Sequence, residues 1–258
     1  MRYFYIVLFL CTTSQIKAQN KAISSNEKLV FTAAYNMSGL MTDLAEVTME
    51  TKAVKTSKAT LLHLKCKATT YSKWDSFFKI RDLYESYVSP TTLKPYLYKR
   101  DINEGGYYKF MQYKFKHKTG TVESLKRKRR KDGKTWDENK NINIGTSTND
   151  IVTTIYKIRN LNFEGASSGK TYNFTVIFDN EEHKVSIIYK GRETINTALG
   201  SKSCHKLAIA AQTDVIQGSN NNLIWLTADA NKIPVYAKFK IPVGNGELKI
   251  KSASGLLN

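Results

Sequence analysis

The sequence concentrates its positive charge in one short run that could bind an anionic partner. Residues 109–140 hold 12 Lys or Arg and 4 Asp or Glu side chains, a surplus of +8 in a chain whose formal net charge is +18. Exposed on a hairpin, such a segment could contact phosphates, sulfated glycans or the acidic headgroups of a membrane. The alternative is a solvated, soluble hairpin. The candidate contact residues form one uninterrupted run: Lys126, Arg127, Lys128, Arg129, Arg130 and Lys131.

Aromatic side chains are unusually dense between residues 74 and 110, where ten fall within 37 residues. Aromatic residues on both faces of one sheet give more apolar surface than a single core needs. Either both faces are covered and these residues pack a core, or a concave face forms an apolar pocket for a lipid-like or glycan ligand. The candidate lining residues of such a pocket are Trp74, Phe78, Tyr84, Tyr107, Met111 and Tyr113.

Residues suited to catalysis or metal binding form no recognisable motif. Cys204 and His205 are adjacent, and neighbours in a strand point to opposite faces, so they cannot act as a nucleophile and its base. The four histidines are scattered and have no ligand-spaced neighbours. We therefore expect no enzymatic activity, no metal and no cofactor. A glycan-acting enzyme, the least favoured alternative, would need two carboxylates that converge from distant strands.

The first 18 residues have the features of a secretory signal peptide. Arg2 precedes an apolar run of about nine residues, whereas a membrane-spanning helix needs roughly 20. We place cleavage between Ala18 and Gln19 and expect a soluble protein in the periplasm or outer envelope. Export leaves Cys66 and Cys204 in an oxidising compartment. There they either form a disulfide or stay buried as two small apolar side chains.

Alternation of apolar and polar residues with a period of two recurs through the rest of the chain, for example in residues 29–37 and 61–71. This pattern is typical of antiparallel sheets with one dry and one wet face, so we expect an all-β fold. Asp179-Asn180, between two β-rich runs, is typical of a hairpin turn. A hairpin of residues 79–88 and 93–101 would place Asp82 opposite Lys99 as a cross-strand charge pair.

One segment has a helical period instead. Ile151, Val152, Ile155 and Ile158 recur at a spacing of 3.6 behind a polar cap that ends in Asp150, which predicts one amphipathic helix over about 150–161. Its simplest role is to plug one end or face of the sheet. Because we find no linker and no repeat, we treat residues 19–258 as a single antiparallel β domain, with a boundary near 140–147 as the alternative.

A family resemblance is carried mainly by residues 79–110, which read KIRDLYESYVSPTTLKPYLYKRDINEGGYYKF. It continues through the helical segment to Gly191-Arg192-Glu193-Thr194, Cys204-x-Lys206-Leu207 and the segment that starts at Trp225. The chain resembles the exported domain-of-unknown-function family 3108. The resemblance implies an envelope protein with a curved, partly open antiparallel β-barrel or sandwich, and no catalytic residues. Residues 225–246 are also similar to periplasmic lipoprotein-carrier proteins, whose curved sheet shelters acyl chains.

These observations favour a non-catalytic, exported envelope protein. We expect it to bind an apolar or amphipathic envelope component, a lipid or a glycan, on a concave sheet, with the basic hairpin on an acidic membrane surface or glycan. An envelope assembly or scaffold protein with a protein partner is the main alternative. Nucleic acid is not an expected partner, because no aromatic residue for base stacking lies within the basic run. The oligomeric state is left open.

Overall fold

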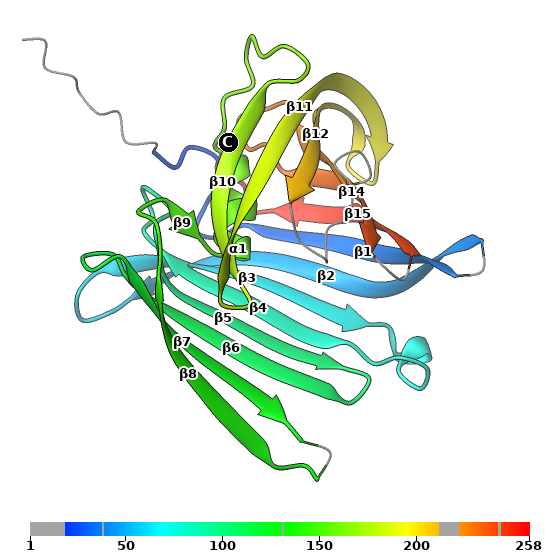
Figure 1. Ribbon diagram of the computed structural model, residues 1–258. Helices are drawn as coiled ribbons and strands as arrows, with labels where there is room; N and C mark the ends of the chain where they lie inside the picture. Colours follow the sequence, from blue (N-terminus) through cyan, green and yellow to red (C-terminus); the bar gives the residue numbers. More distant parts are fainter. Residues whose placement is uncertain (1–18, 38, 131, 212–221, 242–243) are drawn as a thin grey trace, which may run out of the picture.

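The strands that the structure describes form one continuous sheet. A computed structural model describes residues 19–37, 39–130, 132–211, 222–241 and 244–258 (Figure 1). The expected leader over residues 1–18, with its cleavage site after Ala18, and Lys131 of the basic run lie outside the described residues. The sheet has 15 strands in the order β8-β7-β6-β5-β4-β3-β2-β1-β15-β14-β13-β12-β11-β10-β9. The strands are β1 (Lys28–Met37), β2 (Leu40–Lys55), β3 (Thr60–Thr70), β4 (Arg81–Val88), β5 (Pro95–Glu104), β6 (Tyr107–Lys116), β7 (Thr121–Arg129), β8 (Thr135–Asn143), β9 (Thr148–Asn149), β10 (Thr171–Phe178), β11 (Glu181–Thr197), β12 (Gly200–Ala211), β13 (Leu223–Thr227), β14 (Pro234–Ile241) and β15 (Gly244–Ser254).

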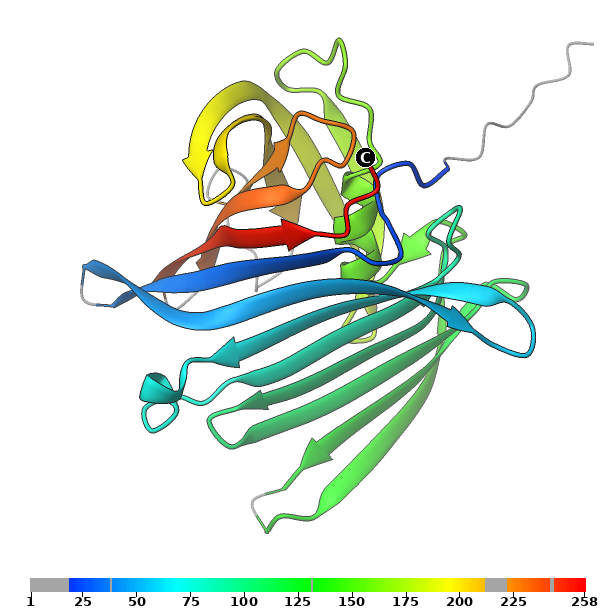
Figure 2. The ribbon, with the colours of Figure 1, turned by 180° about the vertical axis from the view of Figure 1, so that it is seen from behind.

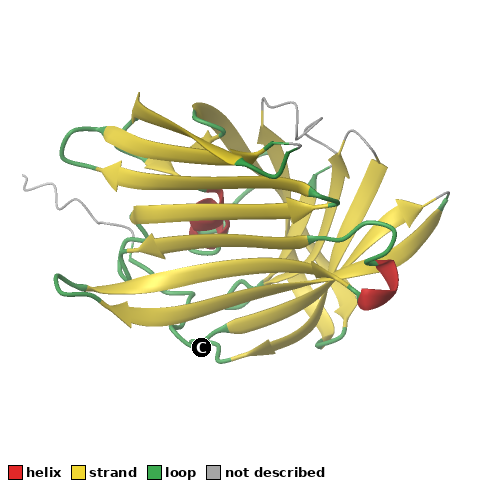
Figure 3. Cartoon of the chain, turned by 90° about the horizontal axis from the view of Figure 1, so that it is seen from below, coloured by secondary structure: helices red, strands yellow, loops and turns green. Residues whose placement is uncertain are grey.

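The topology explains why this sheet curls. Strands that are neighbours in the sheet are also consecutive in the chain, except that β1 pairs with β15 and so joins the two halves. The outermost strands β8 and β9 are themselves consecutive, and only residues 144–147 separate them. A connection of this length reaches at most about 18 Å, so the two edges of the sheet must approach each other there. The edges stay unpaired, which confirms the expected curved, partly open antiparallel barrel (Figures 2 and 3).

The predicted helix is present as α1 (Ile151–Ile158), on the concave side of the sheet, where it contacts β3, β4 and β10 (Figure 2). Its N-cap is Asp150, whose Oδ1 accepts the N–H of Thr153 at 2.8 Å. The other carboxylate oxygen accepts the hydroxyl of Ser86 on β4 at 2.6 Å. Burial raises the pKa of Asp150, against these hydrogen bonds. The cap therefore does two things, since it begins the helix and fixes that end to the sheet.

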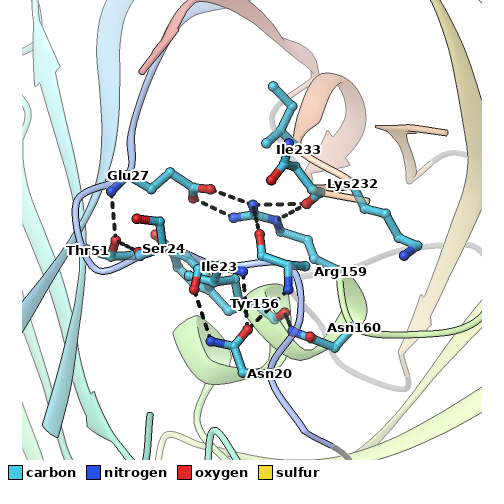
Figure 4. A network of polar contacts seen from close by, with 12 residues as sticks. Asn20, Ile23, Ser24, Glu27, Thr51, Tyr156, Arg159, Asn160, Lys232 and Ile233 are labelled. Atoms are coloured by element: carbon cyan, nitrogen blue, oxygen red, sulfur yellow. Dashed lines mark hydrogen bonds and ion pairs between the residues drawn. The ribbon is translucent and has the colours of Figure 1, made fainter. Parts of the chain in front are cut away.

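The other end of α1 is held by a fully buried ion pair (Figure 4). Both terminal nitrogens of Arg159 lie 2.6 Å from the carboxylate oxygens of Glu27, and neither side chain is exposed to solvent. The same guanidinium donates to the carbonyl oxygens of Ala22 and Asn231. One side chain thus joins the helix to the segment before β1 and to the loop between β13 and β14.

A second, minor helix, η1 (Ser72–Trp74), lies in the connection between β3 and β4.

The connection from β4 to β5 differs from our expectation. Leu83 pairs with Asp101 and Glu85 pairs with Lys99, so the predicted pairing of Asp82 with Lys99 is wrong. The loop extends through Lys94 rather than ending at residue 92, because the N–H of Ser89 donates to the Lys94 carbonyl. The longer loop shifts the register of the hairpin by two residues, so that Val88 is opposite Pro95, and an irregularity between Tyr87 and Val88 adds a third.

The two cysteines do not form a disulfide in the structure. Cys66 and Cys204 are free thiols on β3 and β12, and five strands lie between these two in the sheet order. The strand order, which places them on different parts of the curl, is the physical reason that they do not pair. Burial raises the pKa of Cys66 to about 12 and that of Cys204 to about 11, so both thiols are protonated at neutral pH.

The buried ion pair at the end of α1 leads to a stability prediction. We expect Arg159→Met to lower the free energy of unfolding by about 3–5 kcal/mol, because it leaves the Glu27 carboxylate buried without its partner. The matched control is Arg127→Met, which removes an exposed pair with Asp137 and should cost far less, because exposed ion pairs contribute little to stability. Urea unfolding measures both. Equal losses in the two variants would contradict the role given to Arg159.

Candidate functional site

An apolar pocket of about 190 Å³ opens between α1 and strands β10, β11 and β12. An engineered apolar protein cavity of about 150 Å³ binds benzene, so this pocket can hold a group of at least that size. Several of its lining side chains, among them Phe178, Val185 and Ile209, are only partly buried, and the pocket is therefore accessible from solvent. Its lining consists of Ile151, Thr154, Ile155, Ile158, Val176, Phe178, His183, Val185, Ile187, Ile209 and Ala211.

The regular periods of the surrounding elements produce this lining. Ile151, Thr154, Ile155 and Ile158 recur at the i, i+3, i+4 and i+7 positions of α1 and form one stripe of the helix. The strand residues alternate, and the register places them side by side, with Val176 opposite His183, Val185 opposite Ala211 and Ile187 opposite Ile209. Helix and sheet therefore present facing apolar surfaces that do not close completely.

One end of the pocket is bounded by the turn between β10 and β11, which reaches across to the other half of the sheet. Asp179 and Asn180 both have positive φ angles, +48° and +76°, as a tight hairpin turn requires. The backbone N–H of Asn180 donates to the Tyr113 hydroxyl at 3.0 Å. Its side-chain oxygen accepts the hydroxyl of Ser124 at 2.6 Å. The turn thus bridges β10–β11 to β6 and β7 over the interior of the curl.

Beside this turn lies a group of cations that we name the inner basic cluster: Arg100, Lys109, Lys126 and Lys128. Arg100 is opposite Met111, Met111 is opposite Lys126, and Lys109 is opposite Lys128. Residues that are opposite each other, or two apart on one strand, share a face of the sheet. Met111 is completely buried in the main core, so this shared face is the interior one.

Arg100 and Lys109 share one carboxylate. Both contact Oδ1 of Asp179, Lys109 at 2.6 Å. Burial alone would raise the pKa of Asp179, but the hydrogen bond from Lys109 and the attraction of Arg100 hold it below its usual value. Burial is also the main cause of the lowered pKa of Lys109. The Arg100 guanidinium lies 4.3 Å from the centroid of the Phe178 ring, so the cluster adjoins a wall of the pocket.

None of the six aromatic and Met residues proposed as pocket lining lies in this pocket. Met111 and Tyr113 are core residues, and Tyr84 packs partly buried against the same core. Trp74 and Phe78 lie in the connection between β3 and β4, outside the interior, and Tyr107 is 51% exposed near the inner basic cluster. The lining residues that sequence reasoning missed are those of α1, β10 and β11. These residues could have been found in the sequence from two patterns: the apolar stripe of the helical segment, and the apolar alternation of the hairpin that follows it.

The basic run does not form a single patch, because alternate residues of β7 point to opposite faces. Lys126 and Lys128 belong to the inner basic cluster. Arg127 makes two hydrogen bonds of 2.7 Å to Asp137, and Arg129 lies 4.7 Å from the centroid of the Tyr108 ring on the other face. Arg130 is exposed just beyond the end of the strand.

Two carboxyl groups come together on the interior side of β4 and β5. Glu104 lies near Asp82 and contributes to its raised pKa, and Asp82 accepts the N–H of Asn103 at 2.9 Å. Burial is the main cause that raises the pKa of Asp82 to about 7. Among the described residues, no three His, Cys, Asp or Glu side chains gather as a metal site.

Cys204 and His205 occupy opposite sides of β12, as strand alternation requires. Cys204 packs in the main core, while the ring of His205 lies 4.8 Å from that of Phe163, between centroids, in a second apolar cluster. Burial lowers the pKa of His205 to about 4, so the ring is neutral at pH 7. The two side chains therefore cannot act together as a nucleophile and its base.

The fold and the pocket define a β-barrel-like protein, an open curled sheet wrapped around one helix. The family model of DUF3108, described as a protein of unknown function, matches residues 30–251. The chain therefore belongs to this family, and the resemblance predicted from residues 79–110 is confirmed. The comparison with curated proteins found no match.

The solved structures that match this chain include proteins from three bacteria. A beta-barrel-like protein of the domain of unknown function DUF1849 from Brucella abortus is 8% identical, with a TM-score of 0.54 over 90% of this chain and 98% of that chain. This likeness supports the fold alone. A protein from Bacteroides fragilis described as exported, with a YmcC-like fold, is 9% identical over 89% of this chain and 96% of that chain, with a TM-score of 0.29. A protein from Parabacteroides distasonis described as a lipoprotein is 9% identical over 90% and 96%, with a TM-score of 0.34.

The carboxyl pair leads to a pH prediction. The pKa of Asp82 is about 7 in the folded protein and about 4 in an unfolded chain, so between pH 4 and 7 the folded state binds more protons. Raising the pH through this window should therefore destabilise the protein, by about 1–3 kcal/mol from this group. In Asp82→Asn that loss should disappear. Urea unfolding at pH 4.5 and 7.5 measures the difference, and an unchanged pH dependence in the variant would contradict the assignment.

Proposed function

We propose that this protein is a non-catalytic, exported protein of the cell envelope that binds the apolar part of an envelope component, and that the pocket between α1 and strands β10–β12 is its binding site. The observation that carries the proposal is the pocket itself. Apart from His183 and Thr154, its lining side chains are aliphatic or aromatic, and many remain in contact with water. Filling it would remove this surface from water, at about 0.8 kcal/mol for each buried methylene group.

The size of the pocket limits what it can hold. A volume of about 190 Å³ is only slightly larger than that of the cavity of about 150 Å³ that binds benzene, so the pocket holds a group of about that size. This suits the terminal part of one alkyl chain better than a sugar ring, whose hydroxyl groups would lack partners against aliphatic walls. The proposed ligand is therefore a lipid rather than a glycan, and the remainder of its chain would leave through the open mouth.

The proposed envelope location rests on the N-terminal sequence. An apolar run behind Arg2, followed by Ala18 at the expected cleavage position, is typical of an exported chain. No described helix is long and apolar enough to cross a membrane. After export, an acidic membrane surface would attract the exposed cation Arg130 beyond β7, in addition to whatever the pocket binds.

A second candidate function, an envelope assembly protein with a protein partner, is favoured by the unpaired outer edge of β8. An edge strand offers backbone groups to which another chain can add a strand. β8 carries Asp137, Glu138 and Lys140, and such charged side chains on an edge strand discourage unspecific pairing. Chemical crosslinking in cells followed by purification separates the two functions, because the assembly protein would be recovered with one defined partner attached through β8.

The pocket leads to a binding prediction with 1-octanol, an uncharged ligand with a single alkyl chain. We expect weak, millimolar binding that shifts the methyl NMR signals of Ile155 and Ile209. Ala211→Phe places a ring in the pocket and should weaken binding at least about tenfold. Ala210→Phe is the matched control, since the neighbouring residue points to the other face of β12 and should bind octanol as the unmodified protein does.

Two outcomes would contradict the proposal. One is that octanol shifts no signal from the pocket in the unmodified protein. The other is that Ala211→Phe and Ala210→Phe weaken octanol binding to the same extent, which would place the bound alkyl chain elsewhere.

A further inference from the structure

The inner basic cluster holds cations that are buried without a full set of counter-charges. Only 6% of the Arg100 side chain and 12% of the Lys109 side chain are exposed, yet both use the same oxygen atom of Asp179. Burying a charge is costly unless it is paired and hydrogen-bonded. Two largely buried cations that share one carboxylate therefore leave an unmatched positive charge in this place.

The other charged residues on this face also leave an excess of positive charge. The four cations of the cluster are opposed by Asp179, by Glu138, which lies 3.5 Å from Lys126, and by the pair Asp82 and Glu104. Because the pKa of Asp82 is about 7, this carboxyl group is about half protonated at neutral pH, and the pair carries less than two negative charges. The four cations therefore face fewer than four negative charges. Among the described residues, Lys128 has an aromatic neighbour, Trp136 at 5.9 Å, but no ion pair.

Some polar atoms at the cluster also lack hydrogen-bond partners. The buried Nε of Arg100 has no hydrogen-bond partner among the described protein groups, and neither has the hydroxyl of the adjoining Tyr98. Buried polar atoms without partners are rare in folded proteins, and each calls for an explanation such as a ligand or bound water. Arg100 and Lys109 could together donate several hydrogen bonds to an anion with more than one oxygen atom.

The position of the cluster relative to the pocket suggests what the anion belongs to. Phe178 lines the pocket, and the Arg100 guanidinium lies against the same ring at 4.3 Å. Asp179, the next residue, carries the contacts to Arg100 and Lys109 and is 45% exposed. An alkyl chain that leaves the pocket past Phe178 therefore arrives at a place where cations are in excess.

We infer that the inner basic cluster is the headgroup site of an anionic amphiphile whose alkyl chain occupies the pocket. The ligand class is a single-chain or lipid molecule with a phosphate or carboxylate headgroup. This inference rests on the proposed function, since it needs the alkyl chain to bind in the pocket. It adds that the protein selects charged lipids over neutral ones, and that Lys109 and Arg100 hold the headgroup.

Three ligands separate this inference from the proposed function: 1-octanol, octyl phosphate and inorganic phosphate. Calorimetric titration of the full protein, below the concentration at which octyl phosphate forms micelles, should show octyl phosphate binding at least about tenfold more tightly than octanol. Inorganic phosphate alone should bind much more weakly than octyl phosphate. Raising the salt concentration from 0.1 to 1 M shortens the Debye length from about 10 to about 3 Å and should reduce the advantage of the charged ligand.

The test variant is Lys109→Gln, and its control is Lys116→Gln on the same strand, where the lysine is exposed and pairs with Glu123. The first should reduce the ratio of octyl phosphate to octanol affinity to about one third or less, whereas the second should preserve it. Equal affinity for octanol and octyl phosphate, or an equal ratio in both variants, would overturn the headgroup site. If inorganic phosphate binds as tightly as octyl phosphate, the ligand of the cluster is a free anion, and the inference that it is an amphiphile is wrong. Failure of octanol to bind would instead overturn the proposed function.

Discussion

The buried ion pair between Arg159 and Glu27 is the interaction on which the arrangement of the interior depends. A guanidinium and a carboxylate without solvent contact are stable only when they are paired and hydrogen-bonded, and here the carbonyl oxygens of Ala22 and Asn231 accept further hydrogen bonds from the guanidinium. These partners come from the segment before β1 and from the loop after β13. The helix end, the start of the first strand and the second half of the sheet therefore take up their places together.

With both ends fixed, α1 acts as a rigid spacer inside the curl. Asp150 attaches one end to β4 and Arg159 attaches the other near β1, so the helix cannot move toward β10–β12 to close the gap there. The turn at Asp179-Asn180 is hydrogen-bonded to β6 and β7, and it thereby holds in place the wall of the pocket that β10 and β11 form. The apolar pocket is thus a consequence of where polar groups hold the helix, rather than of missing apolar side chains.

Local patterns in the sequence were sufficient to predict the kind of elements and how they are joined. Alternation predicted the strands, and the cap before Ile151 predicted the helix to within a few residues. The register of β4 and β5 was not predictable, because it depends on a loop that continues to Lys94. The pair of Arg159 and Glu27 was not predictable either, since 132 residues separate its members and neither has a distinctive neighbourhood.

The sequence did not predict which residues line the candidate pocket. An apolar pocket and a basic surface were both expected, yet the aromatic residues around 74–113 mostly pack the core or lie outside the interior. The basic run was expected as one patch, and the alternation of β7 divides it between two faces. Which half faces inward depends on the curl of the whole sheet, and that curl follows from long-range pairing that no single segment encodes.

The pairing of β1 with β15 has a consequence for how the protein comes to be folded. It joins residues near the two ends of the described chain in the middle of the sheet, so the two halves, β1–β8 and β9–β15, can each form from hairpins but cannot be united until β15 is available. Until then β1 presents an open edge along ten residues, which other chains could pair with. Protection of this edge until β15 pairs with it would therefore serve the protein better than rapid early folding of the first half.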